Sequence, residues 1–148
     1  MTPGINVARK AGVQHRIHEY SHDAGHPSYG LEAAEKMRVP APQVFKTLVV
    51  ALDGKALAVG IVPVTRQLNL KQIARAAGSK KAAMAAAADV QRSTGYVLGG
   101  VSPLGQKKRL PTFIDSSARE FAGIYVSAGR RGLEIELSAD DLCALTGG

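Results

Sequence analysis

The stretch 45-FKTLVVALDGKALAVGIV-62 contains two runs of β-forming residues, Phe45–Leu52 and Lys55–Val62, separated by Asp53-Gly54. A two-residue type I′ turn needs positive φ at both central positions, and Asp-Gly is one of the dipeptides that adopt it most readily. The β-branched and apolar residues on both sides favour extended backbone. We therefore predict a β-hairpin here, around which the other elements are arranged.

Helix and strand signals alternate on both sides of this hairpin. Thr2 and Pro3 are suited to begin a helix that Gly12 ends, and Ser138 with Asp141 resembles a capping box at the start of a last helix. The other expected elements are a strand within 13–20, a loop at 23–27, a helix over 31–37, a turn at 40–42, a helix over 70–77, and strands over 96–98, 112–114, 123–127 and 133–137. The alanine-rich segment 79–92 has helix propensity, but a short strand over 81–84 is an alternative.

The order of these elements indicates the α+β class, with a mixed, mainly antiparallel sheet. The length of 148 residues fits one domain, 1–148, with a single core. The sequence contains no internal repeat and no low-complexity linker.

Composition limits the class of protein. No run of about 18 to 20 apolar residues is present, so we expect no membrane span. The first residues lack the pattern of a secretory signal, so we expect a cytoplasmic location. Lys and Arg outnumber Asp and Glu by 19 to 12, which fits a polyanionic partner but also a merely solvated basic surface.

Conventional catalytic and metal sites are not favoured. The chain has four histidines, His15, His18, His22 and His26. The predicted strand and loop do not align their spacings, and no carboxylate or cysteine set completes a metal shell. Cys143 is the only cysteine, and we expect a packed thiol rather than a nucleophile. Nucleophile-elbow, phosphate-loop and dinucleotide motifs are missing from the sequence, so we predict no metal and no cofactor.

A lysine and a glycine-rich loop remain as candidates for chemistry. Lys46 lies within an apolar strand run, so it either extends to solvent at the strand end or lies in a pocket where an anion pairs with it. The segment 99-GGVSPLGQKKR-109 has two glycines followed by a proline. Such a loop is either a structural turn or a place where backbone N–H groups contact a carbonyl or phosphate oxygen.

The sequence resembles the YbaK family of the prolyl-tRNA editing superfamily over nearly its whole length. The matching segments are 43-QVFKTLVV-50, 91-QRSTGY-96, 99–111 and 124-IYVSAGRRGL-133. The resemblance implies a mixed β-sheet curled around a pocket, with flanking helices. It also implies hydrolysis of the ester between a misattached amino acid and the 3′-terminal adenosine of a tRNA.

The family's functional positions carry over to this chain residue by residue. Its essential lysine falls on Lys46, which would hold the phosphate or ribose of the terminal adenosine. Its Gly-x-x-x-Pro loop falls on Gly99–Pro103, whose backbone would hold the aminoacyl group. The implied catalytic residues are thus Lys46, Gly99 and Gly100, and the implied substrate-binding residues are Tyr20, Phe45, Thr47, Val101, Ser102, Pro103, Ser127 and Glu134. Where this chain has Glu134, the family commonly has Asp.

The resemblance further implies a mechanism without a protein nucleophile, in which the thiol of the bound cysteine attacks its own ester carbonyl. The implied substrate is Cys-tRNA(Pro), with Cys-tRNA(Cys) as a second candidate. The implied partners are the 3′ acceptor end of the aminoacyl-tRNA and prolyl-tRNA synthetase. Two alternatives stay open: a deacylase for alanine or another small residue on tRNA(Pro), and a non-catalytic accessory that binds tRNA or the synthetase.

Overall fold

The computed structural model describes residues 2–21, 29–97 and 100–148. Within them, the strands are β1 (His15–Glu19), β2 (Phe45–Leu52), β3 (Ala56–Pro63), β4 (Ala82–Met84), β5 (Thr112–Ile114), β6 (Ile124–Arg130) and β7 (Leu133–Leu137). The helices are α1 (Pro3–Ala11), α2 (Tyr29–Met37), α3 (Leu70–Ala76), α4 (Ala87–Thr94) and α5 (Ala139–Thr146), with 3₁₀ turns η1 (Ala41–Gln43) and η2 (Ser116–Glu120).

The predicted hairpin is confirmed and forms the longest strand pair of the fold. β2 and β3 pair antiparallel over their whole length. Asp53 and Gly54 have φ of 52° and 70°, as a type I′ turn requires. Short strands extend the hairpin on both edges, because β4 pairs antiparallel with β2 and β5 pairs parallel with β3.

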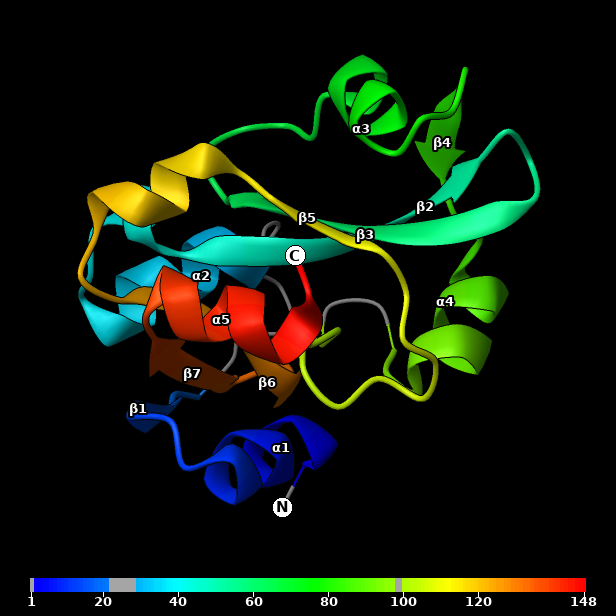
Figure 1. Ribbon diagram of the computed structural model, residues 1–148. Coiled ribbons are helices and arrows are strands. Elements are labelled where there is room, and N and C mark those ends of the chain that lie inside the picture. The colour runs from blue at the N-terminus through cyan, green and yellow to red at the C-terminus, as the bar shows by residue number, and fades with distance from the viewer. Residues whose placement is uncertain (1, 22–28, 98–99) are drawn as a thin grey trace.

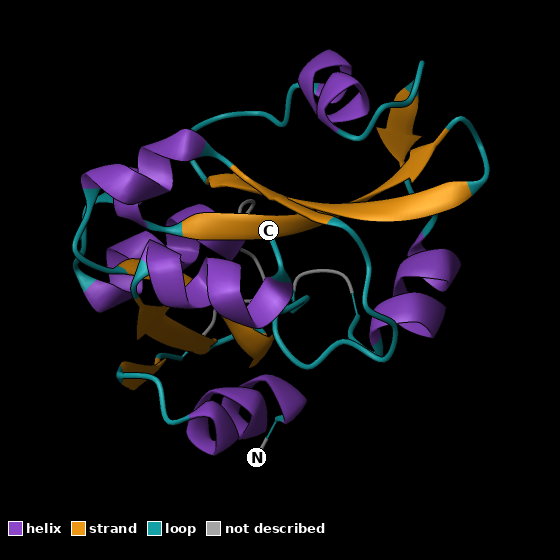
Figure 2. Ribbon diagram, in the orientation of Figure 1, coloured by secondary structure: helices purple, strands orange, loops and turns teal. Residues whose placement is uncertain are grey.

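The remaining strands form a second, fully antiparallel sheet with the order β1–β7–β6. Figures 1 and 2 show the four-stranded sheet above the three-stranded one, with helices around both. Among the described residues, an isolated parallel bridge between Val44 and Tyr125 connects the backbones of the two sheets. One face of each sheet is turned to a shared core, whose buried side chains include Phe45, Val49, Ile61, Ile124, Val126, Ile135 and Leu142.

The predicted class is confirmed, as are the predicted ends of α1 and the predicted start of α5. The pairing is mixed and mainly antiparallel, as α+β requires. Thr2 caps α1 by accepting a hydrogen bond from the Ile5 N–H, and Gly12 ends that helix with φ of 72°. Ser138 caps α5 by accepting a hydrogen bond from the Asp141 N–H at 3.1 Å. The loop expected at 23–27 lies outside the described residues.

The segment from 79 to 98 differs from the simplest prediction. Its alanine-rich part divides into β4 and α4, so the strand alternative is right for 82–84 and the helix begins only at Ala87. The strand expected over 96–98 is wrong at Tyr96 and Val97, and Leu98 lies outside the described residues. Gly95 turns the chain with φ of 82°, and the Tyr96 hydroxyl then donates to the Leu104 carbonyl at 2.6 Å instead of facing a strand partner.

No helix among the described residues is long and apolar enough to cross a membrane.

The hairpin turn provides a test of the fold. Gly54 has positive φ and nothing within 4 Å of the position that a Cβ would take, so Gly54→Ala should be destabilised purely by backbone strain, by about 1 kcal/mol. Gly123→Ala is the matched control, since Gly123 lacks positive φ and its nearest neighbour would lie 3.5 Å away. Urea unfolding measures both variants. Equal stability of the two would contradict the turn assignment.

Candidate functional site

The candidate site lies where the two sheets meet. From the Val44–Tyr125 bridge, β2 and β6 continue in the same direction. Because side chains alternate along a strand, Lys46 and Ser127, two residues further on, lie on the same faces as Val44 and Tyr125 respectively. Val44 and Tyr125 pack together against α2, so these faces form one side of the joined sheets.

β7 and the end of β1 add two further predicted residues to this side. Glu134 is the register partner of Ser127 on β6 and of His18 on β1. Tyr20 follows β1, where its N–H donates to the Gly132 carbonyl at 2.9 Å. The negative charge of Glu134 contributes to raising the pKa of Tyr20, so the two side chains lie near each other. The structure therefore places Tyr20, Lys46, Ser127 and Glu134 on the same side of the joined sheets.

Lys46 is a cation in apolar surroundings. It is half-buried on β2, and its register partner on β3 is Val62. Leu48 and Val50 lie on the same face of β2 as Lys46. Desolvation lowers the pKa of its ammonium group below the usual value. Within the described part of the chain, no carboxylate forms an ion pair with it. An anionic group brought by a ligand would therefore find an ammonium ion without a counter-charge.

Glu134 is a carboxyl group in a similarly incomplete environment. It is 6% exposed, and no described residue donates a hydrogen bond to it. Desolvation raises its pKa from 4.5 to about 8. Burial, followed by the charge of Glu134, raises the pKa of Tyr20 to about 12. Both groups are therefore mainly protonated at neutral pH and able to donate hydrogen bonds.

A buried ion pair that sequence reasoning missed holds α2 against this site. Arg131 Nη2 lies 3.3 Å from Glu32 Oε1, and Glu32 is completely buried. No local pattern links an acid in α2 to a base 99 positions later, so only the fold reveals the pair.

The glycine loop packs against the turn between β6 and β7. Gly99 lies outside the described residues, so its predicted role stays a prediction. A Cβ on Gly100 would lie 2.9 Å from Arg130 Cα and 3.1 Å from the Arg131 nitrogen, so backbone contacts backbone there and only glycine fits. The Gly100 N–H donates to the Val97 carbonyl at 3.0 Å. In the described conformation that N–H is therefore occupied within the loop, and the catalytic role expected of Gly100 stays a prediction.

The next three loop residues turn their side chains inward. Val101 belongs to the main core, Ser102 is completely buried, and Pro103 is buried. The Ser102 hydroxyl accepts a hydrogen bond from the Leu104 N–H at 3.2 Å. The resemblance implied contact with the aminoacyl group through the loop backbone, and the substrate-binding role of these three residues stays a prediction. The Val101 N–H makes no hydrogen bond within the described part of the chain and stays available as a donor.

Phe45 and Thr47 also differ from the expectation that they line a pocket beside Lys46. Strand alternation places both on the opposite face of β2. Phe45 is 2% exposed within the main core. Thr47 is buried as well, and its hydroxyl has no hydrogen-bond partner among the described residues. The side chain of Lys46 thus lies on one face of the sheet, and those of Phe45 and Thr47 lie on the other.

Each of the two described histidines has a hydrogen-bond partner within the protein. His15 Nδ1 lies 2.8 Å from the Val13 carbonyl, and His18 Nε2 lies 2.9 Å from Glu136 Oε1. His22 and His26 lie outside the described residues. Among the described residues, no three His, Cys, Asp or Glu side chains gather as a metal site would require. Cys143 is partly buried on α5.

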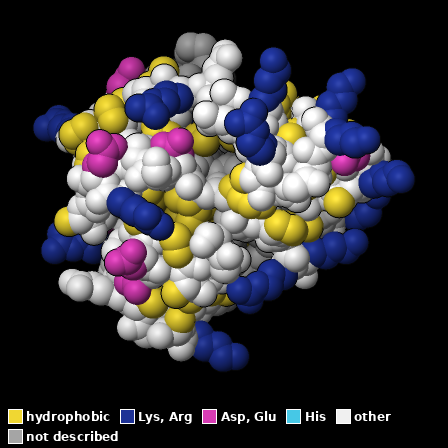
Figure 3. All heavy atoms as spheres, turned by 45° about the horizontal axis from the view of Figure 1, so that its top comes forward, with side chains coloured by type: hydrophobic (Ala, Val, Ile, Leu, Met, Phe, Trp, Pro, Cys, Tyr) yellow, Lys and Arg dark blue, Asp and Glu magenta, His cyan; other side chains and the backbone are white. Residues whose placement is uncertain are grey.

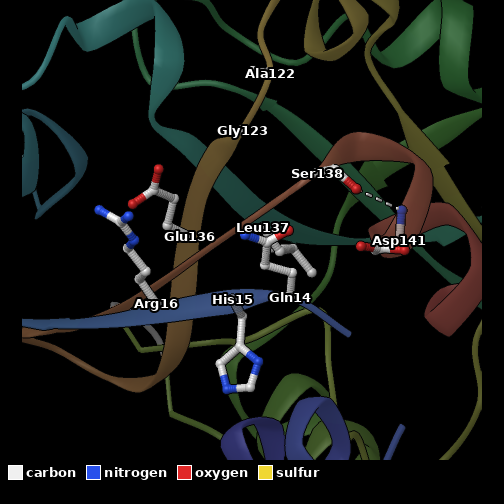
Figure 4. A pocket seen from close by; sticks show the side chains of 9 residues that line it. All are labelled: Gln14, His15, Arg16, Ala122, Gly123, Glu136, Leu137, Ser138 and Asp141. Carbon is white, nitrogen blue, oxygen red and sulfur yellow. Dashed lines mark hydrogen bonds between the residues drawn. The ribbon is translucent and has the colours of Figure 1, made fainter. Parts of the chain in front are cut away.

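A cavity of about 430 Å³ lies at the other end of the three-stranded sheet (Figure 4). It is bordered by 14–16, 122–123, 136–138 and Asp141. Figure 4 shows Arg16 and Glu136 side by side, and Ser138 turned toward Asp141 at the start of α5. None of the predicted site residues borders this cavity. It is therefore separate from the site at the sheet junction.

Comparison with known proteins connects this geometry to a family. The sequence profile of the aminoacyl-tRNA editing domain matches residues 28–145. The chain is 34% identical over 147 residues to a protein of Enterococcus faecalis, EbsC, named as a candidate Cys-tRNA(Pro)/Cys-tRNA(Cys) deacylase, with 99% of this chain and 89% of that protein covered.

Solved structures show the same fold. The crystal structure of a candidate trans-editing enzyme for prolyl tRNA synthetase superposes with a TM-score of 0.81 at 22% identity, covering 100% of this chain and 94% of that one. The crystal structure of the hypothetical protein APE2540 superposes with a TM-score of 0.85 at 24% identity, covering 99% and 95%.

The buried carboxyl group predicts an unusual pH dependence of stability. Native Glu134 keeps its proton up to a pH of about 8, whereas the unfolded chain releases it near 4.5, so the free energy of unfolding should fall as pH rises between these values. Glu134→Gln should lose this decline, which amounts to a few kcal/mol in the wild type. Urea unfolding across this pH range, with exposed Glu120→Gln as the control, measures the difference. Parallel profiles for Glu134→Gln and wild type would contradict the assignment.

Proposed function

The chain belongs to the aminoacyl-tRNA editing domain family, and we propose that it is a deacylase that hydrolyses the ester of mischarged Cys-tRNA(Pro). It would act in trans, beside prolyl-tRNA synthetase. The name of the Enterococcus faecalis relative includes Cys-tRNA(Cys), which is therefore the second substrate to test. The functional unit would be the domain formed by residues 1–148.

The observation that carries this proposal is the half-buried Lys46 ammonium group, which lacks a counter-charge and lies on the same side of the sheets as Ser127 and Glu134. Desolvation makes an ion pair at such a position stronger than at the surface. The phosphate of the 3′-terminal adenosine supplies the missing anion. Lys46 would thereby hold the end of the tRNA while the aminoacyl group extends toward Ser127 and Glu134.

Glu134 and Tyr20 would receive the aminoacyl end. An α-ammonium group entering the pocket provides the counter-charge that lets Glu134 release its proton, because a nearby cation favours the carboxylate. The family commonly has the shorter Asp at this position, so the ammonium group would lie about one methylene nearer to the pocket centre. In the loop, the Val101 N–H has no hydrogen-bond partner among the described residues. It would donate to the ester carbonyl, together with the predicted Gly99.

The proposed reaction uses the substrate's own thiol. The cysteine sulfur attacks the ester carbonyl carbon, the bond from that carbon to the ribose oxygen breaks, and the ribose oxygen takes the proton that the thiol releases. Water then opens the resulting four-membered thiolactone to give cysteine. A free thiol with a pKa of about 8.5 is a few per cent thiolate at neutral pH, and the attack is intramolecular, so positioning supplies most of the catalysis.

Removing the charge of Lys46 tests the proposed site. Lys46→Met keeps the length of the side chain but cannot pair with a phosphate, so kcat/KM for Cys-tRNA(Pro) should fall at least about 100-fold. Stability should be unchanged or higher, because a half-buried charge without a partner is removed. Lys71→Met, at an exposed position of α3, is the matched control. Wild-type deacylation by Lys46→Met with normal circular dichroism would refute the assignment.

Substrate variants test the mechanism. S-methylcysteinyl-tRNA(Pro) should be stable to the enzyme, and Ala-tRNA(Pro) should be cleaved far more slowly than Cys-tRNA(Pro), since both lack the attacking thiol. A size difference of one methylene would change discrimination by only about 1 to 3 kcal/mol. Cys143→Ser should retain full activity, because the protein thiol takes no part. Rapid hydrolysis of the alanyl ester would instead assign the chain to alanine editing with water as the nucleophile.

A further inference from the structure

A concentration of exposed cations lies at the turn of the β2–β3 hairpin, at the opposite end of β2 from Lys46. Figure 3 shows Lys and Arg gathered on the right-hand side of the molecule, where Figure 1 places this turn, β4 and α4. In the same view, Asp and Glu lie mainly on the other side. We name this surface the basic end, and its exposed side chains are Lys55, Lys80, Lys81, Arg92, Lys107 and Lys108.

Backbone hydrogen bonds bring these residues together from separate parts of the chain. The N–H groups of Lys80 and Lys81 donate to the Asp53 carboxylate in the hairpin turn, at 3.1 and 2.8 Å. The N–H groups of 107–108 donate to carbonyls in the last turn of α4, at 3.1 and 2.9 Å. In each of these hydrogen bonds the donor is a backbone N–H group, so the arrangement does not depend on the lysine side chains.

The positive charge of the basic end is not neutralised by the protein. Lys55, Arg92 and Lys108 border a groove of about 340 Å³ whose one acidic side chain, Asp89, pairs with Arg92 at 3.3 Å. Within the described part of the chain, none of the five lysines of the basic end forms an ion pair. The Asp53 carboxylate is directed to backbone amides. The basic end thus has six cations and two carboxylates, and both carboxylates already have partners within the protein.

We propose that the basic end binds the phosphate backbone of the acceptor stem of the same tRNA whose 3′ terminus reaches Lys46, an inference that rests on the proposed function. Seven residues of extended strand separate Lys46 from Asp53, a distance of about 23 Å. A short single-stranded segment joins the terminal adenosine of a tRNA to its stem, so the stem phosphates come within reach. Exposed lysines bind duplex RNA through its phosphates without reading sequence.

Two triple variants with the same change in net charge test this location. Lys55→Ala/Lys80→Ala/Lys108→Ala removes half of the basic end, and Arg9→Ala/Lys10→Ala/Arg119→Ala removes three exposed cations elsewhere. The basic-end variant should raise KM for Cys-tRNA(Pro) at least about tenfold with kcat unchanged. It should also lower the salt dependence of binding to uncharged tRNA(Pro), measured as the slope of log Kd against log salt concentration, by about three. The control variant should behave as wild type.

A minimal substrate separates the two proposals. Cysteine esterified to the ribose of adenosine 5′-monophosphate keeps the terminal phosphate but lacks the stem, so wild type and the basic-end variant should hydrolyse it equally. If the wild type hydrolyses neither substrate, the proposed function fails, while the binding data for uncharged tRNA still test the basic end.

Three results would overturn the assignment of the basic end. The first is equal weakening of tRNA binding by both triple variants, which would make the charge effect non-local. The second is binding by the basic-end variant that matches wild type in affinity and salt slope. The third is wild-type tRNA binding with loss of association with prolyl-tRNA synthetase, which would assign the surface to a protein partner.

Discussion

The parallel bridge between Val44 and Tyr125 is the contact on which the site depends. It joins the sheet that carries Lys46 to the sheet that carries Ser127 and Glu134. The bridge fixes the register between β2 and β6, and strand alternation then decides which side chains share a side. On that side the fold places Lys46, Ser127 and Glu134, while the opposite faces close over the main core.

The same junction explains why so many polar groups are buried near it. Glu32 and Arg131 neutralise each other where α2 meets the β6–β7 turn. Lys46 and Glu134 have no such partner among the described residues. Desolvation lowers the pKa of Lys46 and raises the pKa of Glu134, so the neutral form of each group is favoured. Burying unpaired ionisable groups costs stability. Strain of this kind gathers at functional sites, where the ligand completes what the protein leaves open.

Sequence reasoning was most successful where the signal was local. The Asp53-Gly54 turn, the caps of α1 and α5 and the strand alternation are all set by neighbouring residues, and the structure confirms them. Long-range placement was harder. Phe45 shares a motif with Lys46 but faces the core, because the packing of the two sheets decides which face of β2 is buried. The Glu32–Arg131 pair needs both sheets in place before it exists, so no sequence pattern shows it.

The two incomplete charges also suggest how the site would select its ligand. Under the proposed function, an aminoacyl-tRNA brings a phosphate to Lys46 and an ammonium group to Glu134. Uncharged tRNA brings the phosphate alone, and a free amino acid brings the ammonium group without a phosphate. Each partial ligand leaves one ionisable group desolvated and unpaired. The proposed site would therefore bind the intact ester in preference to either of its products. Hydrolysis would weaken the binding of both the tRNA and the amino acid.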